Sequence, residues 1–204
     1  MKHFKIISVL ILAVIMSCDT VKDPLKDIEG GTCGDENGPL PIRKILVEDY
    51  TGHECPNCPA AAVKLDELIG LYCDHIIPIG IHVGYFAEPS DDFPADYRTE
   101  TGEALDDHFS VSNQGLPNGL INRTEYDGNY VVGRDNWAAA VNLYFSLIPD
   151  FNIKIESEYN EETDEITADL IVETYSQFDF EINLGLYIVE DSIISPQKDG
   201  SDTI

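Results

Sequence analysis

Basic residues are scarce in this sequence. Its 204 residues include 12 Lys and Arg against 38 Asp and Glu, so the formal net charge at pH 7 is −26. This excess of negative charge argues against nucleic acid and anionic membrane surfaces as direct partners of the folded part, because both would repel it. It is compatible with an acidic, well-solvated surface, with solubility outside the cytoplasm and with basic partners.

The N-terminal apolar run, residues 4–16, is too short for a comfortable membrane span. Lys2 and Lys5 form a basic region at its start, and the sequence around its end, residues 15–18, is Ile-Met-Ser-Cys. This ending resembles the lipobox of bacterial lipoprotein signal peptides. The resemblance implies cleavage of residues 1–17 and lipidation of Cys18. The alternative is an ordinary N-terminal anchor helix.

Cysteine is also scarce, and the five cysteines are an odd number, so at least one is unpaired or modified. A lipidated Cys18 would leave an even number, as suits an oxidising compartment. Cys33 lies in an aperiodic, Gly- and Pro-punctuated stretch, so residues 18–41 are predicted to be a flexible tether. Cys33 and Cys73 then form a possible structural disulfide; the alternative is a free Cys33 and a buried Cys73 thiol.

The two remaining cysteines lie in the stretch that organises the chain, residues 44–59, KILVEDYTGHECPNCP. A short apolar strand runs into a Thr-Gly turn, and a C-x-x-C pair, Cys55 and Cys58, opens an apolar-periodic helix. The free N–H groups and the dipole of a helix start stabilise a thiolate there. The pattern therefore predicts a lowered thiol pKa and a reactive pair, with apolar positions 60, 63, 65, 68 and 69 on the buried stripe of the helix.

Strand, C-x-x-C and helix together resemble the thioredoxin superfamily. The longer string VEDYTGHECPNCPAA, with Asp-Tyr-Arg-Thr at 96–99, Gly102, Gly-Leu-Pro at 115–117 and Ile-Asn-Arg at 121–123, resembles one branch of it. That branch is the outer-membrane lipoprotein family named for a twenty-eight-kilodalton outer-membrane protein. The resemblance covers about residues 41–190, and it implies an α/β thioredoxin-like domain over residues 42–148.

The resemblance also assigns roles. In thioredoxin folds a cis-proline loop faces the C-x-x-C, and Pro117 fits this position before a strand at 120–122. Cys55 would be the exposed attacking thiolate and Cys58 the resolving thiol. Asp49 lies six residues before Cys55, the position of the buried strand acid that assists proton transfer. Glu48 is the alternative, since a register slip of one residue exchanges the two; for either, a solvated carboxylate is the competing interpretation.

Other parts of this domain are predicted from pattern. The apolar run 75–83 is typical of a strand buried on both faces, although Pro78 is awkward there. Residues 84–114 form an insertion, helical over 97–109, that is a candidate lid or specificity element near the C-x-x-C. Asp127-Gly128 predicts a hairpin turn, and residues 134–147 a closing helix. Arg123 is expected to pair internally.

From residue 151 the hydrophobic period becomes two. Three amphipathic strands are predicted, with apolar residues alternating over 151–155, 166–172 and 178–188. Residues 150–204 therefore resemble the start of an immunoglobulin-like antiparallel region. Three strands rarely close a sandwich, so this β-rich region is expected to be incomplete or to pack on the first domain.

Three functions are compatible with these patterns. The first is a membrane-anchored thiol–disulfide oxidoreductase that exchanges with protein thiols or disulfides and needs no cofactor. The second is a non-enzymatic surface lipoprotein in which Cys55–Cys58 is a permanent staple and the β region binds a partner. The third, a metal site with His53, His75 or His82, is weakly supported because a second C-x-x-C is missing. His53 near Cys55 would favour its thiolate if protonated, although a surface role is the alternative. The predicted location is the Gram-negative cell envelope, at the outer membrane.

Overall fold

The computed structural model describes residues 42–203. Its elements, in chain order, are β1 Ile45–Thr51, α1 Cys58–Tyr72, η1 Cys73–His75, β2 Ile76–His82, η2 Tyr85–Ala87, α2 Glu100–Phe109, η3 Ser112–Gln114, β3 Asn118–Ile121, β4 Val132–Gly133, η4 Arg134–Asn136, α3 Trp137–Phe145, β5 Phe151–Asn160, β6 Glu165–Thr174, β7 Lys198–Asp199 and β8 Asp202–Thr203. The predicted signal peptide, 1–17, and tether, 18–41, lie outside the described residues.

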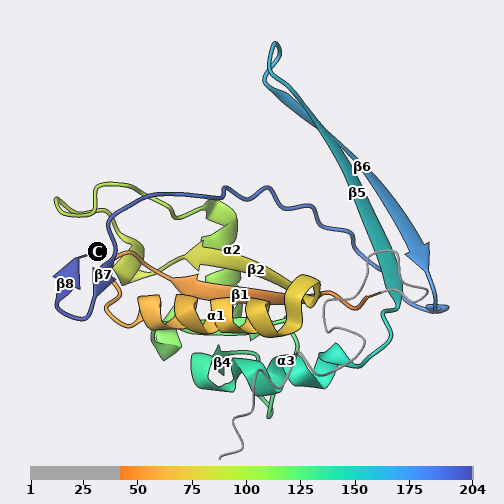
Figure 1. Ribbon diagram of the computed structural model, residues 1–204, viewed down its shortest axis with the longest axis horizontal. Helices are drawn as coiled ribbons and strands as arrows, with labels where there is room; N and C mark the ends of the chain where they lie inside the picture. The colour runs from red at the N-terminus through yellow and green to blue at the C-terminus, as the bar shows by residue number, and fades with distance from the viewer. Residues whose placement is uncertain (1–41, 204) are drawn as a thin grey trace, which may run out of the picture. The chain divides into compact units, whose positions relative to one another are not determined.

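Four of the strands form one mixed sheet with the order β2-β1-β3-β4. β1 runs parallel to β2 and antiparallel to β3, and β3 is antiparallel to β4. α1 lies over one face of this sheet and α2 over the other (Figure 1). The chain is therefore mixed α/β, and the arrangement is compatible with the predicted thioredoxin-like domain.

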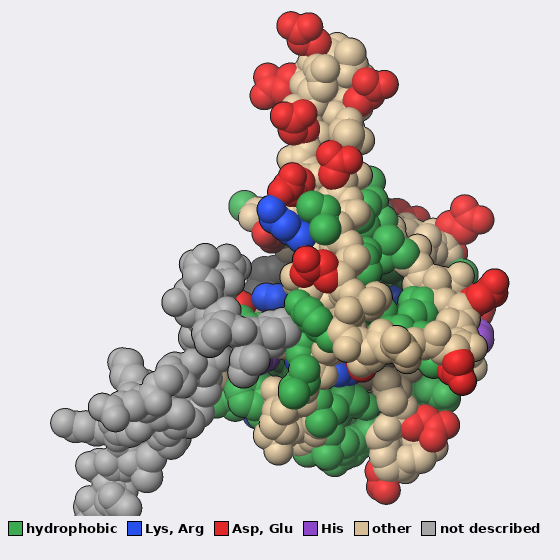
Figure 2. Space-filling model, turned by 90° about the vertical axis from the view of Figure 1, so that its right-hand side faces the viewer, with side chains coloured by type: hydrophobic (Ala, Val, Ile, Leu, Met, Phe, Trp, Pro, Cys, Tyr) green, Lys and Arg blue, Asp and Glu red, His purple; other side chains and the backbone are tan. Residues whose placement is uncertain are grey.

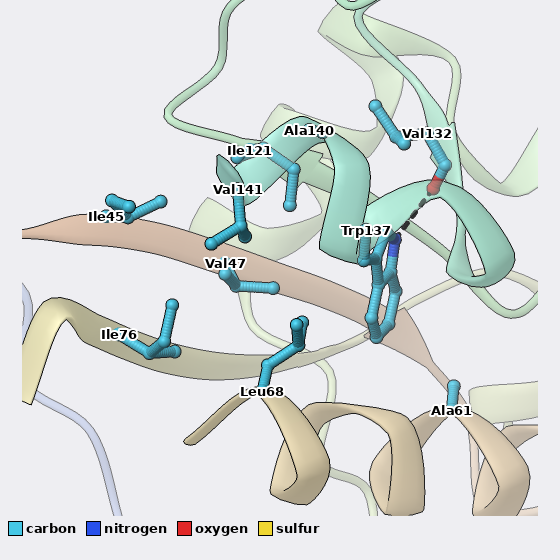
Figure 3. Packing of buried hydrophobic residues seen from close by; sticks show 10 residues of the cluster. All are labelled: Ile45, Val47, Ala61, Leu68, Ile76, Ile121, Val132, Trp137, Ala140 and Val141. Atoms are coloured by element: carbon cyan, nitrogen blue, oxygen red, sulfur yellow. Dashed lines mark hydrogen bonds between the residues drawn. The ribbon is translucent and has the colours of Figure 1, made fainter. Parts of the chain in front are cut away.

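A hydrophobic core fills the space between the sheet and the pair α1 and α3. Ile45 and Val47 of β1, Leu68 of α1 and Trp137 of α3 are all buried in it. The Trp137 indole is fully buried, and its Nε1 donates a hydrogen bond of 2.8 Å to the Val132 carbonyl (Figure 3). Because the indole N–H is satisfied, the ring contributes its whole apolar area to the core.

Gly119 allows this tryptophan to lie directly against the sheet. A Cβ added to Gly119 would come within 2.6 Å of the Glu48 carbonyl oxygen and 2.9 Å of the Trp137 ring. Gly119 faces Asp49 across the β1–β3 ladder. The missing side chain thus fixes how closely α3 approaches the part of the sheet that carries the candidate acid.

A second core cluster covers the opposite face, with Tyr50, Ile81 and Leu120 from the sheet. Leu105 and Phe109 of α2 pack against it, as predicted for the helix in the insertion. The Thr99 hydroxyl caps α2 by accepting a hydrogen bond of 3.0 Å from the Gly102 N–H. The insertion is therefore a structural layer of the domain as well as a neighbour of the C-x-x-C.

The predicted buried stripe of α1 is partly wrong. Val63 is 59% exposed, whereas Cys58, Ala61 and Leu68 are the buried positions. The helix begins at Cys58, whose side chain is buried and bonded to Cys55 in the preceding turn. With Cys58, Ala61 and Leu68 on the buried side, Val63 falls on the outer side of the helix.

The prediction that β2 is buried on both faces is also wrong. β2 is an edge strand, and Ile77 is 42% exposed. This position resolves the difficulty with Pro78, because a residue without an N–H is tolerated where no further strand follows on the other side. The apolar run reflects the parallel pairing with β1 and not full burial.

The C-terminal region contains two of the three predicted amphipathic strands. β5 and β6, with ten residues each, form an antiparallel hairpin in which Phe151 lies opposite Thr174 and Asn160 opposite Glu165. Acidic side chains cover much of its length (Figure 2). The predicted third strand over 178–188 is wrong: these residues pair with no neighbouring strand among the described residues. An immunoglobulin-like region is therefore not confirmed, and the short hairpin β7–β8 follows instead.

Candidate active site

Cys55 and Cys58 form a disulfide, with their Cα atoms 5.4 Å apart. Cys58 is the first residue of α1, and Cys55 lies in the turn between β1 and that helix. We call residues 52–58 the Cys loop. The loop is fixed by hydrogen bonds of its own, from the Cys55 N–H to the Gly52 carbonyl and from the Cys58 N–H to the Cys55 carbonyl. The predicted pair at the start of a helix is confirmed.

The expectation that Cys55 is exposed is wrong. Its exposed fraction is 0%, and that of Cys58 is 2%. Two segments far away in the sequence lie against the Cys loop. Phe86 approaches so closely that a Cβ on Gly52 would lie 2.5 Å from its backbone, and Gln197 donates to the Gly52 and Cys55 carbonyls, each at 3.3 Å. The Cys loop is therefore covered by two distant segments of the same polypeptide, through the backbone of Phe86 and the side chain of Gln197.

Asp49 lies on the α1 side of β1, two residues before the end of the strand. It lines a cavity of about 310 Å³ together with Cys58, His82 and Gln197. Burial raises the pKa of its carboxyl from 3.8 to about 7, because the charged form is poorly solvated there. Its Oδ1 has no hydrogen-bond partner among residues 42–203. The acid can therefore carry or release a proton near neutral pH beside Cys58.

Gly80 keeps this cavity open beside the acid. It is the β2 partner of Asp49 in the parallel ladder, and it lines the same cavity. A Cβ placed on Gly80 would meet nothing within 4 Å. A side chain at this position would therefore find room beside the cavity of the acid.

Glu48, the alternative acid, is directed to the other face of the sheet. It forms an ion pair with Arg123, with Oε1 accepting from Nη2 at 2.6 Å and Oε2 from Nε at 2.9 Å. Glu48 is 1% exposed, so neither acid is the solvated carboxylate of the competing interpretation. The pairing of Arg123 inside the protein is confirmed, and it leaves Asp49 as the carboxylate on the same face as α1.

Pro117 directly precedes β3, and its peptide bond to Leu116 is cis, as predicted. In the antiparallel ladder Asn118 faces Tyr50, so the chain before Asn118 reaches the end of β1 that leads into the Cys loop. The sheet thus places the proline loop and the Cys loop at the same edge. The catalytic roles of Cys55, Cys58, Asp49 and Pro117 stay predictions.

The histidines lie in two places. His53 is 2% exposed, so the alternative of a surface role is wrong; it stacks on Phe93 with centroids 5.4 Å apart, and its Nε2 lies 3.1 Å from the Glu88 carbonyl. His82 lies 6.1 Å from the ring of His53, and burial lowers its pKa from 6.5 to about 4. His75 is held at the opposite end of β2 by the Arg43 carbonyl. No group of three metal-binding side chains forms within residues 42–203.

The insertion lies beside the Cys loop, as predicted. The Glu54 N–H donates a hydrogen bond of 2.9 Å to the Phe86 carbonyl, and the Ser90 hydroxyl bonds to the Glu54 carboxylate. Together with the contact of Glu88 on His53, these bonds fix one wall of the site. The insertion is thus part of the site's framework.

Sequence reasoning missed two residues of the site. Gln197 contacts the Cys loop across 142 residues of sequence, and no local pattern marks it. Arg134 donates a hydrogen bond of 2.8 Å from Nη1 to the Asn57 carbonyl, between the two cysteines. Arg134 begins the predicted closing helix over 134–147, and nothing local in the sequence marks its contact with the Cys loop.

The remaining cysteine predictions concern the N-terminal part. Cys18 and Cys33 lie outside the described residues. Cys73, at the end of α1, is disulfide-bonded. Its pairing with Cys33 therefore stays a prediction, as does lipidation of Cys18. Within residues 42–203 we find no helix whose length and apolar character would let it span a bilayer.

Comparisons with known proteins add little to this site. No protein-family model matches the chain, and a search of curated proteins finds no match. A solved structure similar to this chain is a crystal structure of a protein from Agrobacterium tumefaciens, with 14% sequence identity and a TM-score of 0.43. The similarity covers 64% of this chain and 57% of that one.

Proposed function

We propose that this protein is a thiol–disulfide oxidoreductase with a thioredoxin-like domain, in which Cys55 and Cys58 are the redox pair and Asp49 is the proton carrier. The observation that carries the proposal is the cavity that Asp49 and Cys58 both line. A static disulfide needs no buried, ionisable neighbour, and an uncompensated buried carboxyl costs stability. Such a group with a pKa of about 7 is typical of proton transfer.

A partner thiolate attacks Sγ of Cys55, forming a mixed disulfide and breaking the Cys55–Cys58 bond. The electron pair leaves on Sγ of Cys58, which takes the proton of the Asp49 carboxylic acid. A second thiolate of the partner then attacks the partner sulfur of the mixed disulfide, which closes the partner's own disulfide and expels Cys55 as a thiolate. In the opposite direction Sγ of Cys58 attacks Sγ of Cys55 in the mixed disulfide, Asp49 takes the Cys58 proton, and the partner leaves as a thiolate while the Cys55–Cys58 bond re-forms. The N–H groups at the start of α1 stabilise the negative sulfur.

The lipoprotein assignment is part of the same proposal. The family resemblance and the lipobox-like end of residues 15–18 support an outer-membrane lipoprotein whose partners are protein thiols or disulfides. Labelling with radioactive palmitate tests it, and Cys18→Ser should abolish the label. Label that persists in the Cys18→Ser variant contradicts the assignment.

The redox proposal is tested by the reduction potential of the Cys55–Cys58 pair and by insulin reduction. A potential of roughly −120 to −270 mV is expected of a redox enzyme. Cys55→Ser should abolish insulin reduction, whereas Val63→Ser, on the exposed side of α1, should keep it. Full turnover by Cys55→Ser would contradict the proposal.

Burial of both sulfurs favours a second function, a non-enzymatic surface lipoprotein with a structural disulfide. In that case the potential lies below about −300 mV, as is typical of structural disulfides in secreted proteins. Insulin reduction would then be absent in the wild-type protein, and Cys55→Ser would lower the free energy of unfolding without changing any partner binding. The same potential measurement thus separates the two functions.

A further inference from the structure

The Cys loop is crossed by the segment 197–200, which we call the Cys-loop cover. Its backbone bonds to the loop on both sides of Cys55: the Lys198 N–H donates to the His53 carbonyl at 2.8 Å, and the Gly200 N–H donates to the Pro56 carbonyl at 2.9 Å. The Gln197 side chain adds its bonds to the carbonyls of Gly52 and Cys55. Four carbonyls of the Cys loop thus accept hydrogen bonds from this segment, and the two cysteines of the loop are buried.

The cover also borders the cavity of the acid. Gln197 is one of the residues that line the cavity of Asp49 and Cys58. One segment therefore lies against both the Cys loop and the cavity that holds the carboxyl.

The cover is held weakly by comparison with the core. It consists of the two-residue strand β7 and the turn that joins it to β8, and its residues are half-exposed or exposed. Lys198 pairs with Thr203 within that hairpin, yet its N–H is directed to the Cys loop. Segments with few buried apolar groups and exposed hydrogen bonds open locally at low free-energy cost.

We propose that residues 197–200 are a built-in cover that must leave the Cys loop before a partner sulfur can reach Cys55. The cover binds the loop through backbone N–H groups, so an extended polypeptide is the class of partner that can replace it, hydrogen bond for hydrogen bond. This inference rests on the proposed function for its purpose. Whether the cover limits access to the Cys55–Cys58 disulfide can be measured without any enzymatic turnover.

The test is the rate at which dithiothreitol reduces the Cys55–Cys58 disulfide of the full chain. After quenching, a maleimide labels the released thiols, and mass spectrometry of the peptide that contains both cysteines reads the rate separately from Cys73. Lys198→Pro removes the N–H that bonds to His53, and proline fits here because this N–H takes no part in the β7–β8 ladder. Lys198→Ala keeps the N–H and is the matched control.

Loss of one hydrogen bond should raise the reduction rate about fivefold in Lys198→Pro, and at least about tenfold when Gln197→Ala is added. Lys198→Ala should react at the wild-type rate. Equal rates in Lys198→Pro and the wild type would overturn the proposal, as would equal acceleration by Lys198→Ala.

A second measurement keeps the proposal testable if the proline variant folds poorly. The Gly200 amide hydrogen of the wild-type protein should exchange with solvent more slowly than an unprotected amide, and Gln197→Ala should speed it. Exchange at the unprotected rate in the wild type would overturn the proposal. A variant that is reduced faster by dithiothreitol but never reduces insulin would confirm the cover and contradict the oxidoreductase function.

Discussion

The two regions of the described chain, residues 42–148 and 150–203, both contain strands rich in apolar residues but bury them to very different degrees. In the first region, apolar residues of β1 such as Ile45 and Val47 are fully buried between the sheet and its helices. In the second, Ile153 and Ile155 alternate with polar residues but are 50% and 55% exposed. An alternating pattern thus predicts a strand, whereas burial depends on a second layer that the pattern does not contain.

The largest expected effect lies in the core of the first region. Trp137→Ala should lower the free energy of unfolding by about 3–5 kcal/mol, because it leaves a cavity and frees the Val132 carbonyl from its partner. Urea unfolding measures the change. If it costs less than about 1 kcal/mol, the packing of α3 on the sheet described above is wrong.

The next effect is a dependence on pH at Asp49. Its carboxyl has a pKa of about 7 in the folded protein against 3.8 in the unfolded chain, so between these values the folded state holds the proton more tightly. The stability contributed by the neutral acid is present below about pH 4 and is lost as the pH rises to about 7. Asp49→Asn should therefore raise the free energy of unfolding by on the order of 2–4 kcal/mol at pH 8 and little at pH 4.

Urea unfolding of the oxidised protein at the two pH values checks this prediction. Asp66→Asn is the matched control, because Asp66 lines the mouth of the same cavity on α1. A stability gain for Asp49→Asn that is the same at pH 4 and pH 8 would contradict burial as the cause of the raised pKa.

A smaller effect is expected where the two regions touch. Arg123 pairs with the buried Glu48 and also donates a hydrogen bond of 3.1 Å to the Tyr187 hydroxyl. Arg123→Met should cost about 1–3 kcal/mol, because it leaves Glu48 buried without a counter-charge. Tyr187→Phe, which removes only the contact with the second region, should cost less than about 1 kcal/mol. Thermal unfolding ranks the two, and the reverse order would mean that the C-terminal segment carries the stability.

The smallest effect is expected in the hairpin β5–β6. Ile155→Ser replaces a side chain that is 55% exposed, so the free energy of unfolding should change by about 0.5 kcal/mol or less. A loss near that of Trp137→Ala in the same urea experiment would show that the hairpin has a covering layer in solution. That outcome would remove the contrast between the two regions.

Local signals in the sequence predicted much of the first region. The change of period after Gly52, the C-x-x-C and the Asp-Gly turn correctly placed β1, the cysteine pair at the start of α1 and the turn before β4. They failed for Val63 and for the expected burial of the run 75–83 on both faces. The rotation of α1 and the edge position of β2 depend on the order of the strands in the sheet. The hydrophobic period of a single segment contains no information about that order.

The candidate site shows the same division. Asp49 was the predicted acid and its neighbour Glu48 the alternative; the register of β1 decided between them, since it places Asp49 at the cavity of Cys58 and Glu48 at Arg123. His53 gave no local sign of burial, and its stacking on Phe93 arises from the insertion. The predicted third strand of the second region was wrong because a strand needs a neighbour to bond, and residues 178–188 have none among the described residues.

The sequence by itself determined the pair of cysteines at the start of a helix, the strand before it and the acidic character of the chain. Each of these follows from residue type and short-range spacing, which act before any folding partner is present. Only the tertiary structure decided that both sulfurs are covered and that Asp49 holds a proton near neutral pH. Burial and desolvation come from residues such as Phe86 and Gln197, which folding brings to the Cys loop from far along the chain.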